Sequence, residues 1–445
     1  MENTIVSIAT SLGGAISIIR VSGNDAIFIV NKIFSRDISK FESHTINYGY
    51  IIKDNENIDE VLLSLMRAPK TYTCEDLIEI NCHGGIRTTN KILELLLENG
   101  CDLAEPGEFT KRAFLNGRID LTKAEAVNDL INATNDSARK MAMNSVSGKL
   151  YEKINILRNK LVKIMSNIEV NIDYPEYTDE IVVTDNMMEN FLKEINLELN
   201  KIIKDSENAQ IIKNGVNVGI VGKPNVGKSS LLNAFLDEDK AIVTNIAGTT
   251  RDIVEGSINL SGITINFIDT AGIRTTDNEV EKIGVNKSKK IIDDADFIIL
   301  VLNNNEILSK DEKEIIANLN VDNSVIFVNK SDLENKLELK REHVSGNTVS
   351  LDGLENLKEK ILEKLKVSEI LNEDMTYLGN NRQIELMKKA EFSIKNAIDA
   401  QKNDVPMDLI EIDLRNAWEF LGLITGEYYE NELVDNIFSN FCLGK

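Results

Sequence analysis

The spacing of hydrophobic positions changes along the chain, and each spacing predicts a different kind of structure. In the first part, short β-rich runs are separated by turn signals, so residues 4–10, 15–21 and 77–82 are predicted strands. Apolar residues then recur at helical spacing over residues 87–99, and Gly100 is positioned to close that helix. Strands followed by a helix within one segment indicate an α+β domain.

From Leu121 the hydrophobic pattern is helical over about a hundred residues. The apolar positions between residues 150 and 168 are separated by steps of 4, 3, 4, 3 and 4, and those between residues 188 and 202 by steps of 4, 3, 4 and 3. This heptad spacing predicts two long helices on either side of a break at Pro175. We expect their apolar seams to form the core of a bundle within one chain, because each helix is short; a coiled coil between two chains is the alternative.

Near residues 214–215 the pattern changes to apolar strands separated by helical segments, which indicates a parallel sheet. After about residue 367 helical spacing returns. The predicted fold class is multidomain α/β, with an N-terminal α+β domain, a discontinuous helical bundle domain and an inserted α/β domain whose sheet is mostly parallel. The strands of the inserted domain are predicted at 216–221, 263–268, 297–302 and 325–328. The predicted domain boundaries are 1–118, 119–213, 214–367 and 368–445.

Charge and composition exclude several classes of protein. The 445 residues include 50 Lys and Arg against 72 Asp and Glu, a net charge of -22 that opposes diffuse binding to nucleic acid or to an anionic membrane. No apolar run approaches the roughly 20 residues that span a bilayer, and the N-terminus carries no secretion signal, so a cytoplasmic protein without a membrane partner is predicted. The four cysteines form no C-x-x-C pair and there are three histidines, which disfavours a zinc site or a Ser/His/Asp triad.

A phosphate-binding motif follows the predicted strand 216–221. Residues 222–229 read GKPNVGKS, which fits G-x-x-x-x-G-K-[ST], and an apolar helix comes next. The glycines let backbone N–H groups point at phosphates, Lys228 neutralises the β and γ oxygens, and Ser229 is a ligand for Mg²⁺. The residues of this segment that are predicted to bind the nucleotide are Asn225, Val226, Gly227, Lys228, Ser229 and Ser230.

Two shorter motifs follow later strands and identify the nucleotide. Residues 269–272 fit D-x-x-G, whose aspartate binds Mg²⁺ through water and whose glycine amide meets the γ-phosphate. Residues 329–332 fit N-K-x-D, whose aspartate accepts two N–H donors that guanine has and adenine lacks on that edge. The inserted domain is therefore predicted to be a P-loop GTPase domain. Its other predicted nucleotide contacts are Thr244, Asn245, Ile246, Ala247, Gly248, Thr249, Thr250, Asp269, Thr270, Ala271, Gly272, Asn329, Lys330 and Asp332.

These motifs resemble those of the translation-factor-like GTPases, with one departure. Such proteins commonly have a glutamine after D-x-x-G to orient the attacking water, whereas this chain has Ile273, which has no side-chain hydrogen-bonding group. We therefore expect a monovalent cation beside the phosphates. Glu281 is the candidate for positioning water, and a solvated helix-face glutamate is the alternative. The predicted K⁺ ligands are Asn225, Thr244, Ile246 and Thr249, and the predicted Mg²⁺ ligands are Ser229 and Thr250.

Several stretches outside this domain resemble one family, the tRNA-modifying GTPases called MnmE or TrmE. Residues 3–6 (NTIV), 20–23 (RVSG), 72–76 (YTCED) and 83–85 (HGG) look like its N-terminal domain, and so does the long run AEPGEFTKRAFLNG over 104–117. The chain ends in FCLGK, close to that family's terminal C-[IL]-G-K. The resemblance runs from one end of the chain to the other.

The resemblance implies a K⁺-dependent GTP hydrolase (EC 3.6 type) that acts on tRNA. With an FAD-binding partner, MnmG (GidA), the family installs a (carboxymethyl)aminomethyl group on C5 of the wobble uridine of certain tRNAs. The one-carbon donor is 5-formyl- or methylene-tetrahydrofolate. A homodimer is implied, and a heterotetramer with the partner. The implied folate ligands are Arg20, Glu79, Arg118 and Lys445, and the implied catalytic residues are Glu281 and Cys442, although a cysteine in that place can also be a small packing residue.

Three features leave alternatives open. The N-terminal loop, residues 11–14, is shorter than the family's and lacks proline, and the fifth guanine element is predicted at Ser350-Leu351-Asp352, where the family has S-A-K. Residues 111–163 contain eleven basic and five acidic residues, which indicates either a tRNA contact or a solvated bundle face. The alternative function is a GTP-switched RNA or ribosome assembly factor that performs no modification chemistry.

Overall fold

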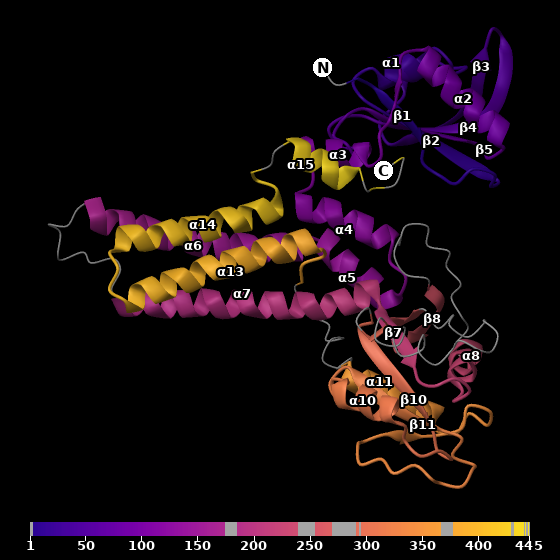
Figure 1. The fold of residues 1–445 in the computed structure, drawn as a ribbon. Coiled ribbons are helices and arrows are strands. Elements are labelled where there is room, and N and C mark those ends of the chain that lie inside the picture. Colours follow the sequence, from indigo (N-terminus) through magenta and orange to yellow (C-terminus); the bar gives the residue numbers. More distant parts are fainter. Residues whose placement is uncertain are drawn as a thin grey trace. The chain divides into compact units, whose positions relative to one another are not determined.

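The computed structural model describes residues 3–173, 185–238, 254–268, 291–292, 295–365, 377–428, 431–439, 441 and 444. None of the helices among these residues combines the length and the apolar character needed to cross a membrane. The elements, labelled in Figure 1 where there is room, are in chain order β1 (Ile5–Ile8), β2 (Ile16–Ser22), α1 (Ala26–Asn31), the short 3-10 helix Ile38–Lys40, β3 (Thr45–Lys53), β4 (Glu56–Met66), β5 (Leu77–His83), α2 (Ile86–Glu98), β6 (Asp102–Leu103), α3 (Glu108–Leu115), α4 (Leu121–Ile131), α5 (Asp136–Val146), α6 (Lys149–Asp173), α7 (Asp185–Asn214), β7 (Val216–Val221), α8 (Lys228–Glu238), β8 (Val254–Leu260), β9 (Ile263–Ile268), β10 (Phe297–Asn303), α10 (Lys310–Asn318), β11 (Ser324–Asn329), β12 (Val344–Ser345), α11 (Leu354–Lys364), α13 (Asn381–Lys402), α14 (Met407–Thr425) and α15 (Asn431–Phe438).

The chain divides into two compact units, which are described separately. The first unit consists of Met1–Ile131, Met143–Asn196 and Glu385–Lys445, and the second of Asn132–Ala142 and Leu197–Ile384. The first contains the N-terminal sheet and long helices, and the second contains the other sheet with its helices. The protein is thus a multidomain α/β protein, as predicted.

The N-terminal sheet has six strands in the order β3-β4-β5-β2-β1-β6. Neighbouring strands are antiparallel, except that β1 and β6 are parallel. Helices α1 and α2 pack on one face, because alternate residues of β2, β4 and β5 are buried with them in a single core. The predicted strands correspond to β1, β2 and β5, and the predicted helix corresponds to α2.

The end of α2 follows from its glycine. Gly100 has a φ of 113°, a left-handed conformation that a residue with a Cβ rarely adopts. Its N–H donates to the carbonyl of Leu97 (3.2 Å), and the N–H of Cys101 donates to that of Leu96 (3.0 Å). These two bonds form the Schellman arrangement, which satisfies the last carbonyls of a helix. The predicted role of Gly100 in closing the helix is confirmed.

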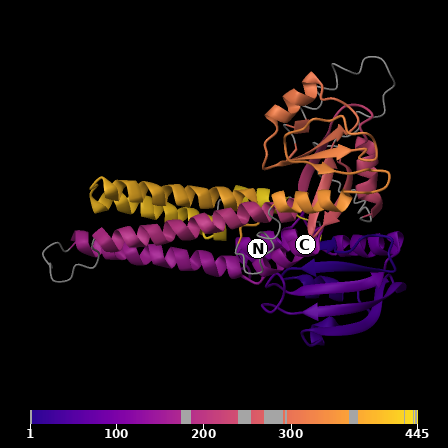
Figure 2. The same ribbon diagram turned by 90° about the horizontal axis from the view of Figure 1, so that it is seen from below.

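The heptad seams lie in α6 and α7, and all of their apolar positions are buried. Helix α14 lies against α6 within the first unit, and the two run side by side in Figures 1 and 2. The core of these helices therefore forms within one chain, as expected, and does not need a second copy. The seam residues, each at most 6% exposed, are Leu150, Ile154, Leu157, Leu161, Ile164, Ile168, Met188, Leu192, Ile195, Leu199 and Ile202.

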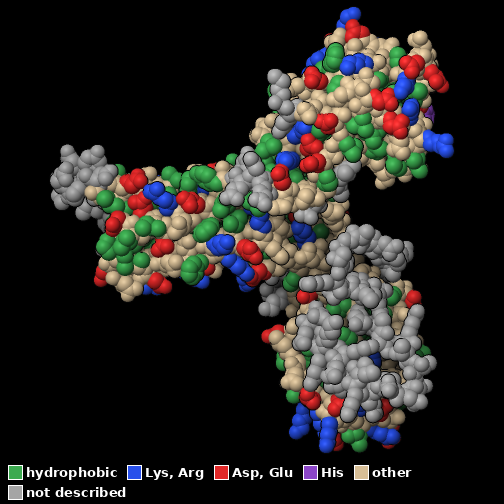
Figure 3. All heavy atoms as spheres, turned by 45° about the horizontal axis from the view of Figure 1, so that its top comes forward, with side chains coloured by type: hydrophobic (Ala, Val, Ile, Leu, Met, Phe, Trp, Pro, Cys, Tyr) green, Lys and Arg blue, Asp and Glu red, His purple; other side chains and the backbone are tan. Residues whose placement is uncertain are grey.

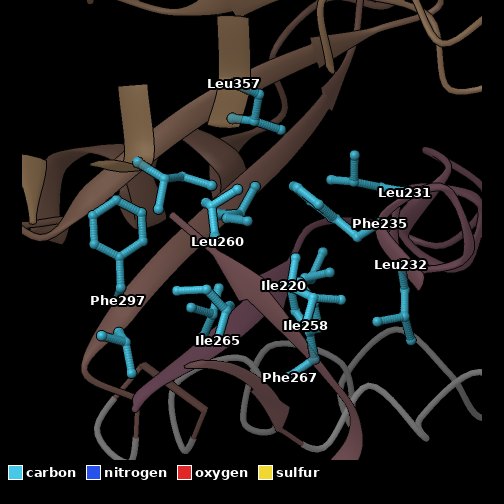
Figure 4. Packing of buried hydrophobic residues seen from close by; sticks show 14 of the residues in the cluster. Ile220, Leu231, Leu232, Phe235, Ile258, Leu260, Ile265, Phe267, Phe297 and Leu357 are labelled. Carbon is cyan, nitrogen blue, oxygen red and sulfur yellow. The ribbon is translucent and has the colours of Figure 1, made fainter. Parts of the chain in front are cut away.

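The sheet of the second unit has the strand order β12-β11-β10-β7-β9-β8. Five of these strands are parallel to their neighbours, and β8 pairs antiparallel with β9. Residues of β7, β8, β9 and β10 form one core with α8 and α11; Figure 4 shows Ile220, Phe235 and Phe267 packed together in it. Every residue of β10 and β11 is buried, which agrees with the continuous apolar runs in the sequence.

Candidate functional site

The phosphate loop joins β7 to α8, as the motif requires. Gly222 and Gly227 have φ angles of 148° and 104°. A Cβ on Gly222 would lie 2.4 Å from the carbonyl oxygen of Val301, and one on Gly227 would lie 2.1 Å from Nδ2 of Asn329. Both positions are therefore limited to glycine by backbone conformation and by space. Ser229 and Ser230 lie in the first turn of α8, where free backbone N–H groups favour anions.

Lys228 lies across the loop rather than pointing to solvent. Its ammonium donates to the carbonyls of Gly222 (2.8 Å) and Lys223 (2.6 Å). Burial lowers the pKa of Lys228, because it disfavours the charged form. An ammonium has three hydrogens, so this arrangement holds the charge at the first residue of the helix and leaves one hydrogen for a phosphate oxygen.

The N-K-x-D motif lies directly against the phosphate loop. Asn329, the last residue of β11, donates from Nδ2 to the carbonyl of Val226 (2.8 Å). Lys330 donates from Nζ to the carbonyl of Asn225 (3.1 Å). Two motifs that are a hundred residues apart in the sequence thus share one site, and the guanine element supports the phosphate element.

The position of the fifth guanine element differs from the prediction. The N–H of Thr348 donates to Oδ1 of Asn329 (3.0 Å), and Nδ2 of Asn347 donates to Oδ1 of Asp332 (2.9 Å). The prediction that Ser350-Leu351-Asp352 forms the fifth guanine element is therefore wrong. The Ser350 hydroxyl donates to Asp352, and these two residues come after the segment that contacts the N-K-x-D motif. The segment that reaches the N-K-x-D residues is 346–348, directly after β12.

Asn304 is a site residue that the sequence interpretation missed. It follows β10, its N–H donates to the carbonyl of Asn329 (3.0 Å), and its Nδ2 donates to the carbonyl of Leu333 (3.0 Å). It therefore holds both ends of the N-K-x-D segment. The available signal was a polar residue at the carboxyl end of a buried parallel strand, where ligand sites of open α/β sheets lie.

A second cluster of predicted residues lies on the N-terminal sheet. Arg20 of β2 and Glu79 of β5 are paired in register, and Nε and Nη2 of the arginine donate to Oε1 of the glutamate (3.0 and 2.8 Å). Nη1 of Arg20 donates to the carbonyl of Gly444 (3.1 Å). A Cβ on Gly444 would lie 2.8 Å from the carbonyl oxygen of Ile8, so the backbones are in close contact there.

Aromatic side chains bring a third predicted residue to this cluster. The guanidinium of Arg118 lies 4.8 Å from the ring centroid of Tyr72 and donates to its carbonyl (3.2 Å). That of Arg20 lies 6.0 Å from the same ring and 5.6 Å from the ring of Phe109. Arg20, Glu79 and Arg118 thus form one site, which we call the N-terminal arginine site.

A buried ion pair network includes residues of the long run 104–117. Arg112, only 4% exposed, donates to Glu75 (3.2 Å) and Glu108 (2.7 Å), and the Ser22 hydroxyl donates to Glu75 (2.8 Å). Burial alone lowers the pKa of Arg112, but the hydrogen bond to Glu108 and the charge of Glu75 outweigh it and raise that pKa. The sequence interpretation assigned no role to Arg112; a basic residue within a largely apolar helix face was the signal.

The basic surplus over 111–163 is largely neutralised. Six of the basic side chains there have carboxylate partners. Four of the six pair with carboxylates outside the segment, which are Glu75, Glu108, Glu194, Glu427 and Asp435. On the face of the helical part seen in Figure 3, Lys and Arg side chains lie among Asp and Glu side chains. This pattern favours the solvated bundle face over a tRNA contact.

Several predicted site residues lie outside the residues that the structure describes. They are Thr244, Asn245, Ile246, Ala247, Gly248, Thr249, Thr250, Asp269, Thr270, Ala271, Gly272, Glu281, Cys442 and Lys445.

Comparison with known proteins identifies the family. The family model for the MnmE helical domain matches residues 121–442, and that for the GTP-binding protein TrmE N-terminus matches residues 4–118. The chain belongs to the MnmE (TrmE) family. The family's curated members include the tRNA modification GTPase MnmE of Staphylococcus epidermidis, 47% identical over 457 aligned positions. The protein of the same name from Staphylococcus haemolyticus is 45% identical over 456 positions, and in both cases the match covers 100% of this chain and 99% of the relative.

Among solved structures, the chain is similar to the G domain of the T. maritima FeoB iron transporter, with 29% sequence identity and a TM-score of 0.25. The match covers 34% of this chain and 98% of the FeoB domain. The resemblance to the MnmE family that the sequence indicated is confirmed by the family models and the full-length relatives.

Proposed function

We propose that this chain is a GTP hydrolase of tRNA modification that uses K⁺ and a reduced folate and works with an FAD-binding partner on the wobble uridine. Membership of the MnmE family carries the tRNA modification part. The single structural observation that supports GTP is the contact of Asn329 and Lys330 with the carbonyls of Val226 and Asn225, because it joins the guanine element to the phosphate element.

The residues of the phosphate loop fit a Mg²⁺-bound nucleotide. Lys228 presents a positive charge at the N-terminus of α8, and the backbone N–H groups there add to the field that binds phosphate. Ser229 and, in the proposal, Thr250 hold Mg²⁺, which neutralises charge on the transferred phosphoryl group when bound. Asp332, held by Asn347, accepts the N–H donors of guanine.

The proposed cation site takes over the function of an arginine finger or a glutamine. Ile273 cannot orient water, so the proposal assigns that task to Glu281 and assigns K⁺ to Asn225, Thr244, Ile246 and Thr249. Asn225 has a φ of 63° and its carbonyl is held by Lys330. The backbone at Asn225 is therefore held in place, which suits a residue whose side-chain oxygen is proposed to bind K⁺.

The N-terminal arginine site fits the chemistry of a reduced folate. A folate tail carries carboxylates, for which Arg20, Arg118 and, in the proposal, Lys445 supply cations. The amino-pyrimidine end of a pterin carries N–H donors, and Glu79 supplies a carboxylate whose Oε1 is engaged by Arg20. Among the described residues, Oε2 of Glu79 has no hydrogen-bond or ion-pair partner, and we assign it to the pterin as acceptor. Cys442 is proposed as a catalytic thiol.

The proposed partners are a second copy of the chain, the FAD-binding protein MnmG and tRNA, with a heterotetramer as the assembly and the cytoplasm as the location. The N-terminal segment 1–118 is proposed as the folate-binding and dimerisation domain, 214–367 as the GTPase domain, and 119–213 with 368–445 as the helical domain.

The proposal is tested by reconstitution. Unmodified tRNA is incubated with this chain, the FAD-binding partner, GTP, K⁺ and methylene-tetrahydrofolate, and the nucleosides are analysed by mass spectrometry. We expect a C5-modified wobble uridine that is lost in Lys228→Ala and in Arg20→Ala. GTP hydrolysis without any modified uridine in the complete mixture contradicts the proposal and favours the assembly-factor alternative.

A further inference from the structure

The second residue of the phosphate loop forms an ion pair that the GTPase motif does not require. Nζ of Lys223 lies 2.8 Å from Oε2 of Glu312. Glu312 is 5% exposed, and the side chain of Lys223 is 33% exposed. A carboxylate this buried needs a charged or hydrogen-bonding partner, because desolvation is costly for an unpaired charge.

The structure fixes Glu312 independently of Lys223. Glu312 belongs to the capping box of α10: the N–H and the hydroxyl of Ser309 donate to Oε2 (2.8 and 2.9 Å), and the N–H of Glu312 donates to the Ser309 hydroxyl (3.3 Å). A capping box ties a side chain to its own helix end. The position of the carboxylate is therefore set by α10, and the loop residue is the movable member of the pair.

The backbone of Lys223 is bonded to the lysine that meets the phosphates. Its carbonyl accepts a hydrogen bond from Nζ of Lys228 (2.6 Å). The chain of contacts thus runs from Ser309 through Glu312 and the side chain of Lys223 to its carbonyl and on to Lys228. A shift of Lys223 moves one of the two carbonyls that hold the Lys228 ammonium.

We propose that the Lys223–Glu312 pair is a positioning pair that sets nucleotide affinity by fixing the phosphate loop to the start of α10. This inference rests on the proposed GTPase function. The pair acts on the loop conformation that GDP and GTP both need, so it affects the two affinities alike. Lys228 meets the phosphates of either nucleotide, whereas the residues assigned to Mg²⁺, K⁺ and the attacking water lie outside this chain of contacts, so turnover at saturating GTP changes little.

The test measures binding of a fluorescent GDP analogue and steady-state GTP hydrolysis with the full chain. We expect Lys223→Ala and Glu312→Gln each to raise the Kd for GDP and the KM for GTP about fivefold, with kcat changed by less than about twofold. Lys223→Arg should restore both, because it keeps the charge. The double variant should lose no more than either single variant, because the two residues act as one unit.

The matched control is Lys360→Ala, which breaks the 2.8 Å pair with Glu342 in the same unit, at the cavity beside β12 and α11. It should leave nucleotide affinity unchanged. An unchanged Kd in Lys223→Ala, or an equal loss in Lys360→Ala, overturns the inference. Lys228→Ala separates it from the proposed function: retained GTP binding in that variant contradicts the nucleotide site itself, whereas unchanged binding in Lys223→Ala alone contradicts only the positioning pair.

Discussion

Single side chains in the nucleotide site act mainly by holding other groups in place. Asp332 is the residue predicted to recognise guanine, and Asn347 holds one of its oxygens at 2.9 Å. Asn304 holds the backbone on both sides of Asp332. Recognition of a base edge needs acceptors at fixed positions, because a misplaced carboxylate loses both of its hydrogen bonds.

Asp332→Asn should relax the preference for GTP over ATP. The amide replaces an acceptor of two N–H groups by one acceptor and one donor, so we expect a loss of about tenfold or more in GTP affinity and no loss for ATP. Competition of GTP and ATP against a fluorescent GDP analogue measures the preference. Asn347→Ala should give a smaller change in the same direction, and Asn320→Ala, at a surface turn, should give none. An unchanged preference in Asp332→Asn contradicts the assignment.

The cysteines should react in an order set by burial. Burial, with a further effect of Asp102, raises the pKa of Cys101 to about 12, and burial raises that of Cys82. Since only the thiolate is nucleophilic, a raised pKa means less reactive form at any pH below it. Among the three cysteines that the structure describes, iodoacetamide at pH 8 should modify the half-buried Cys74 first. Peptide mass mapping measures the order, and the difference should vanish in urea; equal labelling of Cys101 in the folded protein contradicts it.

Elements with a strong hydrophobic period were predicted well, because burial of their apolar residues alone determines whether they form a helix or a strand. The heptad positions of α6 and α7 are buried, and the apolar run of β10 is buried throughout. The hairpin of β3 and β4 was not predicted as such. Its exposed face also carries apolar residues, among them Ile46 and Leu62, so the alternation of a half-buried sheet is weak.

Turns and long-range partners limited the remaining predictions. The hairpin turn at Asp54 and Asn55 has both φ angles positive (50° and 69°), the conformation of a two-residue hairpin loop, yet it lacks the glycine that usually signals one. Strand β12 has only two residues, too few for a period, so the fifth guanine element was predicted in the wrong place. The partner of Lys223 lies far along the chain, and no local pattern indicates it.

At the scale of elements, α15 docks on the start of α3. A Cβ on Gly107 would lie 2.6 Å from the carbonyl oxygen of Phe438 and 2.8 Å from Cβ of Phe441, and the φ of Gly107 is 70°. Phe438 and Phe441 also share a core with Phe114. The close approach at Gly107 therefore lets the C-terminal segment reach the N-terminal part of the chain.

Gly107→Ala should release this segment, because the added methyl overlaps both phenylalanines. We expect faster proteolytic cleavage near residue 430 and a destabilisation about 2 kcal/mol greater than for Gly117→Ala. Gly117 has a φ of 72° but no atom within 4 Å of its Cβ position, so it reports the backbone strain alone. Limited proteolysis with mass spectrometry and urea unfolding make the comparison. Equal behaviour of the two variants contradicts the proposed docking.

At the scale of the whole molecule, the two candidate sites belong to different units. The phosphate loop and the N-K-x-D motif are in the second unit, and the N-terminal arginine site is in the first. Helices α7 and α13 each contain residues of both units, so continuous helices connect them. If GTP hydrolysis drives chemistry at the arginine site, the groups that trigger hydrolysis control the whole cycle.

Hydrolysis should depend on the monovalent cation, because Ile273 cannot orient the attacking water. We expect GTP turnover in KCl to be about tenfold or more above that in NaCl, because a cation of the right size beside the phosphates takes the place of an arginine finger. An arginine finger accelerates hydrolysis by more than this factor. Light scattering in each salt should report a dimer. Asn225→Gly should make the two salts equal, since glycine tolerates the φ of 63° at this position and lacks the side chain that supplies the ligand oxygen.

The outcomes separate three possibilities. If K⁺ stimulates hydrolysis and Asn225→Gly abolishes the stimulation, Asn225 is supported as a K⁺ ligand. The site then works without a glutamine or an arginine finger. Equal rates in the two salts contradict the cation mechanism but leave GTP binding by Lys228 and Asp332 intact. Salt-independent turnover by a monomer contradicts both the cation mechanism and the proposed homodimer. The assembly-factor alternative would then explain the Ile273 departure better than coupled wobble-uridine chemistry does, because slow intrinsic hydrolysis suits a switch that a partner activates.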